Sequence, residues 1–243
     1  MITAEKTVRE ITATLPCSVK VFDKLGVDFC CGGGKSLQDA CMNAGVEFDE
    51  VLRRLEEAAA HQSDDPALAT WQTATLVDLM SHIVSRHHGF VREEMPRISF
   101  LVEKVATKHA PNHPELATIR AAWQALVAEL TAHMLKEEQV LFPYVSNLEQ
   151  AVLAGKPEPV AFFGTVKNPI RAMINEHDAA GDLLKQMRKA SNGFQAPADG
   201  CGSYTAMYQG IEEFEKDLHL HIHLENNILF PRAVKMEETG AAA

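Results

Sequence analysis

The fold is decided by a short sequence that occurs twice, HMLKEEQVLFP at residues 133–143 and HIHLENNILFP at residues 221–231. Both copies read His-x-x-x-Glu and continue to Leu-Phe-Pro. A further histidine precedes each copy, His88 in the first half (133 − 88 = 45 residues) and His177 in the second (221 − 177 = 44 residues). Self-similarity at this scale predicts that the second half of the chain is a near copy of the first, each half being a pair of helices.

Both copies lie on an apolar seam with the three- and four-residue steps of an α-helix, so their inward side chains share one face. The seam of the second copy is Met207, Ile211, Phe214, Leu218, His221, Glu225 and Ile228, and that of the first is Ile119, Ala122, Leu126, Leu130, His133, Glu137 and Val140. A carboxylate on such a seam is costly to bury unless it is paired or bound to a metal. The pattern therefore predicts a metal site with six ligands: His88, His133, Glu137, His177, His221 and Glu225.

One His-x-x-x-Glu on a helix is ordinarily a surface pair or a core histidine, but a matched second copy favours the metal site. Imidazole and carboxylate donors suit iron or manganese, and helical bundles commonly hold di-iron carboxylate sites. We expect two iron ions joined by an oxo or hydroxo bridge, with Glu137 and Glu225 between them and two histidines on each; manganese or zinc are the expected substitutes. Glu129 and Glu176 are candidate partners that orient an imidazole, the alternative being ordinary solvated charges.

Helical periodicity dominates the chain, and we expect an all-α protein whose main part is an up-down four-helix bundle. The predicted helices of the bundle span residues 75–110, 114–147, 168–191 and 203–235, and Pro96 is expected to kink or interrupt the first. The predicted organisation is a small N-terminal helical module (1–62), a linker (63–74), the bundle (75–236) and a tail (237–243).

The chain has 243 residues and a formal net charge of 23 − 33 = −10. This acidic balance argues against nucleic-acid and anionic-membrane partners, since both bind basic patches. No apolar run approaches the roughly 20 residues of a membrane span, and the first residues lack the basic and apolar regions of a secretory signal. Five cysteines, two of them adjacent, suit a reducing compartment better than a disulfide framework. We therefore expect a cytoplasmic protein.

The loop DFCCGGGKS (28–36) carries the adjacent Cys30 and Cys31. Exposed backbone amides and the positive end of the following helix favour a thiolate there, which makes the two cysteines candidates for a thiol role. The alternative is a tight turn with two half-buried thiols. Other residues are expected to have no function: Cys201 as a small apolar side chain, His109 and His113 as solvated residues, and His219 and His223 as residues pointing away from the core seam.

With these motifs the sequence resembles a haemerythrin-like bundle and, more specifically, the di-iron RIC family of iron-centre repair proteins, of the YtfE and ScdA type. The matching stretches are DFCCGGGKSL (28–37), HHGFVREEMPRI (87–98), HMLKEEQVLFP (133–143), NEHDAAGDLL (175–184) and HIHLENNILFP (221–231). The resemblance implies the ligand set already selected by the repeat and chooses His88 over the neighbouring His87. It also implies an ScdA-type N-terminal module. Haemerythrins that carry oxygen have a fifth histidine ligand with no clear counterpart here, which argues against simple oxygen transport.

The resemblance implies a protein that helps to repair iron–sulfur clusters damaged by nitrosative or oxidative stress. Whether it delivers iron or removes nitric oxide is left open by the motifs, and we expect a repair factor that supplies iron from the di-iron centre rather than a turnover enzyme. The implied partners are damaged iron–sulfur proteins and the gases nitric oxide and oxygen, and a homodimer is a further expectation. Thiol chemistry, a cluster contact or dimerisation becomes the favoured role for Cys30 and Cys31. Two alternatives remain, namely nitric oxide binding with reduction to nitrous oxide, and a non-enzymatic oxygen or redox sensor.

Overall fold

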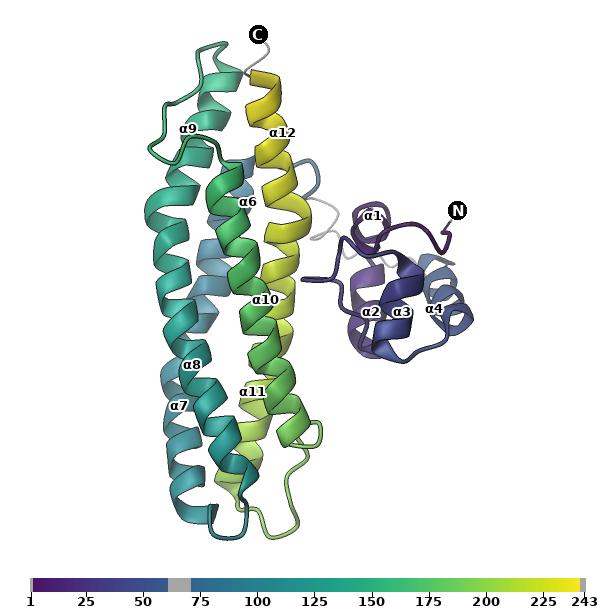
Figure 1. The fold of residues 1–243 in the computed structure, drawn as a ribbon, viewed down its shortest axis with the longest axis vertical. Coiled ribbons are helices and arrows are strands. Elements are labelled where there is room, and N and C mark those ends of the chain that lie inside the picture. Colours follow the sequence, from purple (N-terminus) through teal and green to yellow (C-terminus); the bar gives the residue numbers. More distant parts are fainter. Residues whose placement is uncertain (1, 61–70, 241–243) are drawn as a thin grey trace.

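The computed structural model describes residues 2–60 and 71–240, which form a small helical module beside a long helical bundle (Figure 1). The helices of the module are α1 (Val8–Thr14), α2 (Ser18–Leu25), α3 (Leu37–Ala44) and α4 (Phe48–Ala60). Those of the bundle are α6 (Leu76–His82), α7 (Gly89–His109), α8 (Glu115–Lys136), α9 (Phe142–Leu153), α10 (Lys167–Ala190), α11 (Gly202–His223) and α12 (Phe230–Gly240). Three π-helical turns complete it: η1 (Ile83–His88), η2 (Glu137–Leu141) and η3 (Leu224–Leu229).

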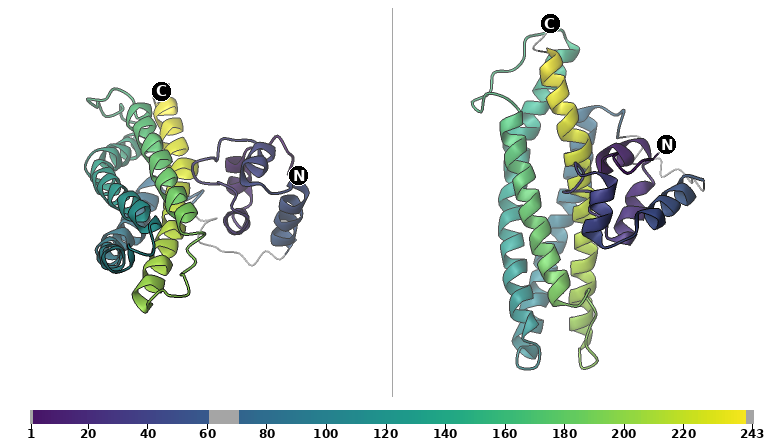
Figure 2. Two further views of the ribbon diagram at one scale, coloured as in Figure 1. Left: turned by 60° about the horizontal axis from the view of Figure 1, so that its bottom comes forward. Right: turned by 45° about the vertical axis from the view of Figure 1, so that its right-hand side comes forward.

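Within residues 71–240 these elements join end to end into four long antiparallel rods (Figures 1 and 2). The rods are α6–η1–α7, α8–η2–α9, α10 and α11–η3–α12. This arrangement confirms the predicted all-α bundle. Pro96 lies inside α7, which continues through it to His109, so it does not end the helix. The second and fourth rods run beyond their predicted ends, to Leu153 and Gly240.

The predicted ligands lie between two apolar clusters of the bundle core. One cluster, which includes Val91, Leu130 and Leu184, fills the half of the bundle nearest the α7–α8 and α10–α11 loops and continues into the N-terminal module. The other, which includes Leu141 and Ile170, fills the half that contains α9 and α12. Each fully buried large apolar side chain stabilises the fold by about 1.5–3 kcal/mol relative to an exposed one. The two clusters therefore hold the predicted ligands, which lie between them, in place.

The π-helical turns coincide with predicted ligands. η1 ends at His88, η2 begins at Glu137 and η3 contains Glu225. A π turn inserts a residue into the helix and is frequent at functional sites. The insertion shifts the seam by one residue after Glu137, so Leu141 is buried while Val140, predicted to point inward, is only half-buried. Regular α-helical spacing alone could not give this register.

Each half of the bundle also carries a buried glutamate that accepts hydrogen bonds from the start of another helix. Glu149 in α9 accepts from the backbone amides of Leu76 and Val77, at 2.7 and 3.0 Å, and so caps α6. Glu237 in α12 accepts from the backbone amide of Val166, at 2.8 Å, just before α10. Amides at a helix start have no partner within the helix, and a carboxylate also suits the positive end of the helix dipole.

These capping glutamates extend the internal repeat. They follow Glu137 and Glu225 at the same separation (149 − 137 = 12 and 237 − 225 = 12). Each repeat therefore contains a predicted bridging glutamate and, 12 residues later, a glutamate that accepts from the start of the paired helix. Residues 237–240, which were predicted to belong to a tail (237–243), are part of α12, and Glu237 is only 8% exposed.

The N-terminal module packs its four helices around Val8, Phe22, Leu37 and Leu55, all fully buried. Hydroxyl groups cap two of its helices: Thr7 accepts from the Glu10 amide at the start of α1, and Ser36 accepts from the Asp39 amide at the start of α3. The loop between α2 and α3 projects from the module to the bundle (Figures 1 and 2). Residues 61–70, which include most of the predicted linker, lie outside the described residues.

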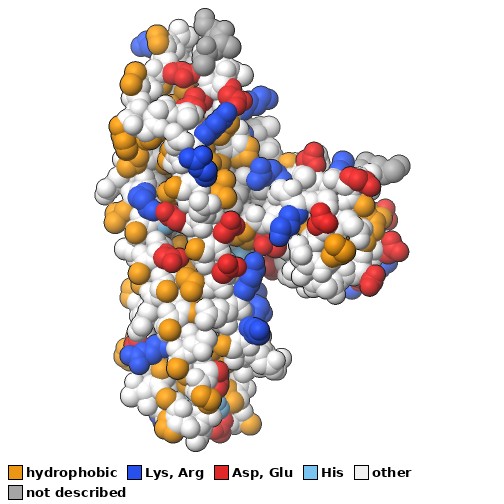
Figure 3. Space-filling model, in the orientation of Figure 1, with side chains coloured by type: hydrophobic (Ala, Val, Ile, Leu, Met, Phe, Trp, Pro, Cys, Tyr) orange, Lys and Arg blue, Asp and Glu red, His pale blue; other side chains and the backbone are white. Residues whose placement is uncertain are grey.

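In the part of the chain that the structure describes, no helix has both the length and the apolar character needed to cross a membrane. On the face drawn in Figure 3, basic and acidic side chains are interspersed over both the module and the bundle. One such pair joins the two parts, since Lys185 Nζ on α10 lies 3.4 Å from Asp28 Oδ2 in the projecting loop. Exposed pairs of this kind contribute about 0–1 kcal/mol, so docking of the module depends on other contacts.

Candidate metal centre

The six predicted ligands converge in the bundle as two groups of four that share both glutamates. One group is His88, Glu137, His221 and Glu225, and the other is His133, Glu137, His177 and Glu225. Within each group the candidate ligand atoms all lie within 4.8 Å of one another, and every member is buried. The Nε2 atoms of His88 and His221 are 3.2 Å apart, and those of His133 and His177 are 3.1 Å apart. Each half of the repeat thus contributes one histidine to each group and one glutamate to both.

The donor atoms at the centre fit a metal site. Both carboxylate oxygens of Glu137 and one of Glu225 are buried without a hydrogen-bond partner. Glu137 Oε2 lies 3.3 and 3.4 Å from the Nε2 atoms of His88 and His133, and Glu225 Oε2 lies 3.0 Å from that of His177. A buried carboxylate oxygen without a partner carries a desolvation cost that a cation would remove. Four imidazoles and two carboxylates are also the donor types that iron, manganese or zinc accept in helical bundles.

The charges of the two glutamates dominate the electrostatics of the centre. Burial opposes a charged imidazole, but the Glu137 carboxylate outweighs it and raises the pKa of His133 to about 9. For His221, which is fully buried, desolvation prevails and lowers the pKa. Burial likewise opposes the charged form of Glu225, yet the adjacent His221 and His177 hold the pKa of this carboxyl well below its usual range. The Glu225 carboxyl is therefore kept in the charged form that binds cations.

Three of the four histidines have a hydrogen-bond partner on the ring nitrogen that faces away from the centre. His88 Nδ1 pairs with Glu138 at 2.6 Å, His133 Nδ1 with Glu176 at 2.8 Å, and His177 Nδ1 with Asn226 Oδ1 at 2.9 Å. Such partners fix the orientation and tautomer of a ligating imidazole. His221 Nδ1 has no partner among the described residues.

The two candidate orienting carboxylates lie in different environments. Glu176 contacts His133, as its place beside His177 in the sequence suggested, and also pairs with Lys136. Glu129 is exposed on α8 and has no side-chain partner among residues 2–60 and 71–240. Glu138 and Asn226 were not among the residues predicted to form the site. Each directly follows a predicted bridging glutamate, at the same place in the repeat, and this position was the signal available in the sequence.

The cysteine loop of the N-terminal module docks next to the centre. Asn226, which orients His177, also donates from Nδ2 to the carbonyl of Cys30 at 3.1 Å. The Cys31 thiol lies 3.5 Å from the carbonyl oxygen of His177. Asp28 closes the loop by accepting from the amides of Cys31 and Gly32. The two parts of the chain, separate in sequence, therefore meet at His177, a predicted ligand.

The environment of the cysteines differs from the predicted one. Cys30 is only 5% exposed, and its neighbour Cys31, together with burial, raises the pKa of the Cys30 thiol well above its ordinary value. The expectation that exposed amides would favour a Cys30 thiolate is therefore wrong, because the loop is turned into the bundle and its amides bond to Asp28 instead. Cys31 is half-buried.

Asn227 forms the second anchor of the loop. Its Nδ2 donates to the Phe29 carbonyl at 2.8 Å, and its Oδ1 accepts from Arg9 at 2.9 Å. A Cβ atom on Gly33 would lie 2.5 Å from Asn227 Oδ1, so this close approach requires glycine. His223, predicted to point away from the core without a function, is buried against Phe29 with its ring 5.7 Å away. It does leave the metal seam, but it faces the module rather than solvent.

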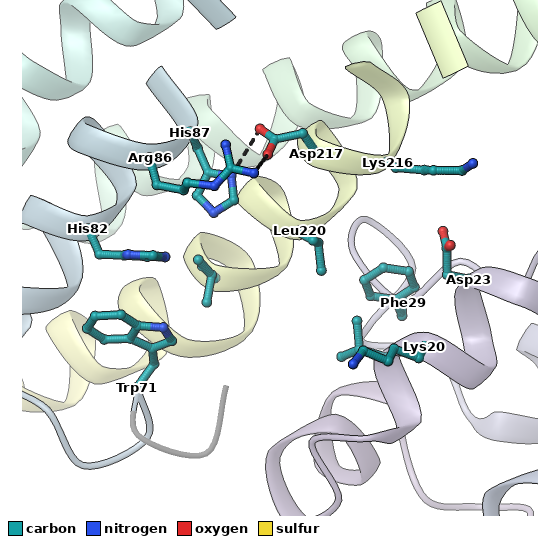
Figure 4. Close-up of a pocket in the computed structure, with 12 residues that line it drawn as sticks. Lys20, Asp23, Phe29, Trp71, His82, Arg86, His87, Lys216, Asp217 and Leu220 are labelled. Atoms are coloured by element: carbon teal, nitrogen blue, oxygen red, sulfur yellow. Dashed lines mark hydrogen bonds and ion pairs between the residues drawn. The ribbon is translucent and has the colours of Figure 1, made fainter. Parts of the chain in front are cut away.

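A pocket of about 280 Å³ opens between the module and the bundle near the ligands (Figure 4). Its apolar lining includes Phe29, Trp71 and Leu220. His87 also lines it, with Nδ1 held 3.0 Å from Asp217 Oδ2 and with its ring stacked on His221 at 5.6 Å. His87 is therefore outside both ligand groups, in agreement with the choice of His88, and separates the pocket from the centre.

We expect Asn226→Ala to weaken iron binding by about 10–100-fold, the usual effect of losing a partner that orients a ligating histidine. The affinity is measured by competition with a chelator of known strength. Asn227→Ala is the matched control, because it removes a loop anchor without touching a ligand. Equal losses in both variants would mean that docking of the loop, and not the bond to His177, supports iron binding.

Comparisons with known proteins agree with this geometry. Residues 79–233 match the hemerythrin HHE cation binding domain, and residues 4–59 match a domain of unknown function, DUF542. The chain is 34% identical over 233 residues to the iron–sulfur cluster repair protein YtfE of Pectobacterium atrosepticum, covering 96% of this chain and 98% of the relative. It is 35% identical over 233 residues to the protein of the same name from Musicola paradisiaca, with the same coverage. The chain therefore belongs to the family of haemerythrin-like proteins with an N-terminal DUF542 domain that includes the iron–sulfur cluster repair proteins named YtfE.

Proposed function

We propose that this protein repairs iron–sulfur clusters damaged by nitrosative or oxidative stress, using iron held by its six histidine and glutamate ligands. The observation that carries the proposal is the pair of buried ligand groups sharing Glu137 and Glu225, with the cysteine loop docked against His177. The names of the relatives support the cluster as the object of repair. Its partners would be damaged iron–sulfur proteins in the cytoplasm; a homodimer stays a prediction.

In this proposal His88 and His221 would hold one iron, His133 and His177 would hold the other, and Glu137 and Glu225 would be shared between the two positions. The iron, when bound, supplies a redox-active cation that can be transferred or can bind a small gas. The chain supplies the selectivity. The two buried glutamates favour a cation, and Glu138, Glu176 and Asn226 keep three of the four imidazoles in position. The loop that carries Cys30 and Cys31 contacts the predicted ligand His177 and its partner Asn226.

The proposal is tested with an iron–sulfur dehydratase whose cluster has been damaged by nitric oxide. We expect the protein loaded with ⁵⁷Fe to restore dehydratase activity and to leave ⁵⁷Fe in the repaired cluster, detected by Mössbauer spectroscopy. Iron-free protein and iron-loaded Glu129→Ala are the negative and positive controls, since Glu129 is exposed and outside both ligand groups.

Failure of the fully iron-loaded protein to restore activity would refute the repair function. Two other results would each point to an alternative. Nitrous oxide released on adding nitric oxide to the reduced protein would favour gas reduction. A ligand-dependent change of shape in solution scattering, without repair, would favour a sensor.

A further inference from the structure

A second thiol site lies at the opposite end of the bundle from the C-terminus, where α7 ends and α11 begins. Cys201 immediately precedes α11, and its Sγ lies 3.3 Å from Nε2 of His109, the last residue of α7. About 20 residues of α11 separate Cys201 from His221, which at 1.5 Å per residue is about 30 Å. The site is therefore independent of the metal centre and of the Cys30–Cys31 loop.

The Cys201–His109 pair lines an open pocket of about 450 Å³ with a basic rim. Lys104 and Lys108, one helical turn apart on α7, contribute to this pocket, together with Gly202 and Ser203 at the first turn of α11. Both lysines are exposed, and none of the described residues that line the pocket is acidic. The pocket thus combines a sulfur nucleophile, an imidazole and two cations beside the positive end of a 22-residue helix.

Neighbouring groups orient the imidazole without neutralising the pocket. The edge of the Tyr204 ring packs on His109 with their centroids 5.3 Å apart. The nearby carboxylates of Glu115 and Asp199 pair with His113. Its Nδ1 lies 3.0 Å from Glu115 Oε1, and its Nε2 lies 3.1 Å from Asp199 Oδ1. His113 is thus held in an ion-pair cluster, and the prediction that it is merely solvated is wrong.

The electrostatics agree with this geometry. The His109 imidazole and the Tyr204 amide lower the pKa of the Cys201 thiol to about 7, against the opposing effect of burial. The predictions that Cys201 is an inert apolar residue and His109 a solvated one are therefore wrong. In contrast, burial raises the pKa of Cys17, another half-buried thiol of the same chain.

We infer that Cys201 is a modification site at which the thiol, assisted by His109, forms a mixed disulfide with anionic small-molecule disulfides recognised by Lys104 and Lys108. In this exchange the Cys201 thiolate attacks one sulfur of the reagent, so that a new S–S bond forms and the S–S bond of the reagent breaks. The protein sulfur is oxidised and the departing sulfur is reduced. The departing thiolate takes a proton from the His109 imidazolium or from solvent.

The first experiment measures the rate of mixed-disulfide formation at Cys201 against pH, using iron-loaded full-length protein, oxidised glutathione and peptide mass spectrometry. We expect the wild-type rate to rise with a midpoint near pH 7 and to exceed the rate at Cys17. His109→Gln should raise the midpoint from about 7 toward the ordinary thiol value of about 8.5, while the Tyr204 amide keeps it below that value. Because a more basic thiolate is also more nucleophilic, the variant should react up to about fivefold more slowly at pH 6.5 and up to about fivefold faster at pH 10.

The second experiment compares oxidised glutathione with the neutral 2-hydroxyethyl disulfide. Replacing Lys104 and Lys108 by Gln should reduce the preference for oxidised glutathione by about threefold or more, since two favourable charges are lost. The ratio of the two rates cancels any change in the thiol pKa, and both lysines are exposed, so the fold is unaffected. A midpoint near 8.5 in the wild type, or a preference unchanged by the lysine substitutions, would overturn the inference.

Discussion

Replacing Glu137 by Ala is expected to remove most of the iron from the protein. Glu137 belongs to both ligand groups, so its loss takes a carboxylate from each metal position at once. Loss of a residue that only orients a ligand costs about 10–100-fold in affinity, and loss of a shared ligand should exceed the upper end of this range. Elemental analysis and the visible absorption of the purified variant measure the effect. Glu225→Ala should behave in the same way, because Glu225 is shared in the same manner.

Iron should also stabilise the wild-type fold. A ligand present at 100 times its dissociation constant stabilises the native state by about 2.7 kcal/mol, and Glu137→Ala should lose this increment. The control is Glu129→Ala on the preceding helix, which removes an exposed carboxylate and should keep both iron and stability. Full iron retention in Glu137→Ala and Glu225→Ala would contradict the assignment of these residues as shared ligands.

The bundle and the convergence of the six predicted ligands were predictable because a repeat leaves two independent copies of the same signal. One His-x-x-x-Glu on an apolar seam is ambiguous, whereas His133–Glu137 and His221–Glu225 with matched upstream histidines specify both the helices and the face that meets the core. All six residues are buried and lie together in the two ligand groups. The periodicity did not predict the π turns, because an inserted residue changes the register only where tertiary packing accepts it, as at Val140 and Leu141.

Contacts between segments that lie far apart in the chain could not be predicted from the sequence. Nothing local places the Cys30 loop against Asn226, about 200 residues later in the chain, and the pKa of Cys30 follows from that burial. Cys201 and His109 likewise meet only because two helix ends lie side by side. Propensity and periodicity describe one helix at a time, whereas the reactivity of a thiol depends on its three-dimensional surroundings.

Replacing Glu237 by Ala is expected to destabilise the iron-free protein by about 3 kcal/mol. The carboxylate is 8% exposed and accepts three hydrogen bonds, from Tyr144 Oη at 2.8 Å, Thr165 Oγ1 at 2.5 Å and the Val166 amide at 2.8 Å. These bonds tie α9, α10 and α12 together. Each buried donor left without a partner costs about 1–3 kcal/mol. Water can replace the carboxylate at only some of the three donors, so the total cost is about 3 kcal/mol. Urea unfolding followed by circular dichroism gives the free energy of unfolding.

The neighbouring residue provides the control for this prediction. Glu238 pairs with Lys167 on the surface, where both side chains are more than half exposed, so Glu238→Ala should cost at most about 1 kcal/mol.

The effect of Glu237 should also depend on pH. Burial opposes its charged form, but the bonds from Thr165 and Val166 prevail and lower the pKa of Glu237. A carboxyl whose pKa is lower in the folded than in the unfolded state stabilises the fold above its unfolded value of about 4.3 and loses this contribution as the pH falls through the folded value. The difference between wild type and Glu237→Ala should therefore be full at pH 7 and shrink below about pH 4. A difference that is independent of pH would mean that the side chain acts through packing and not through its charge.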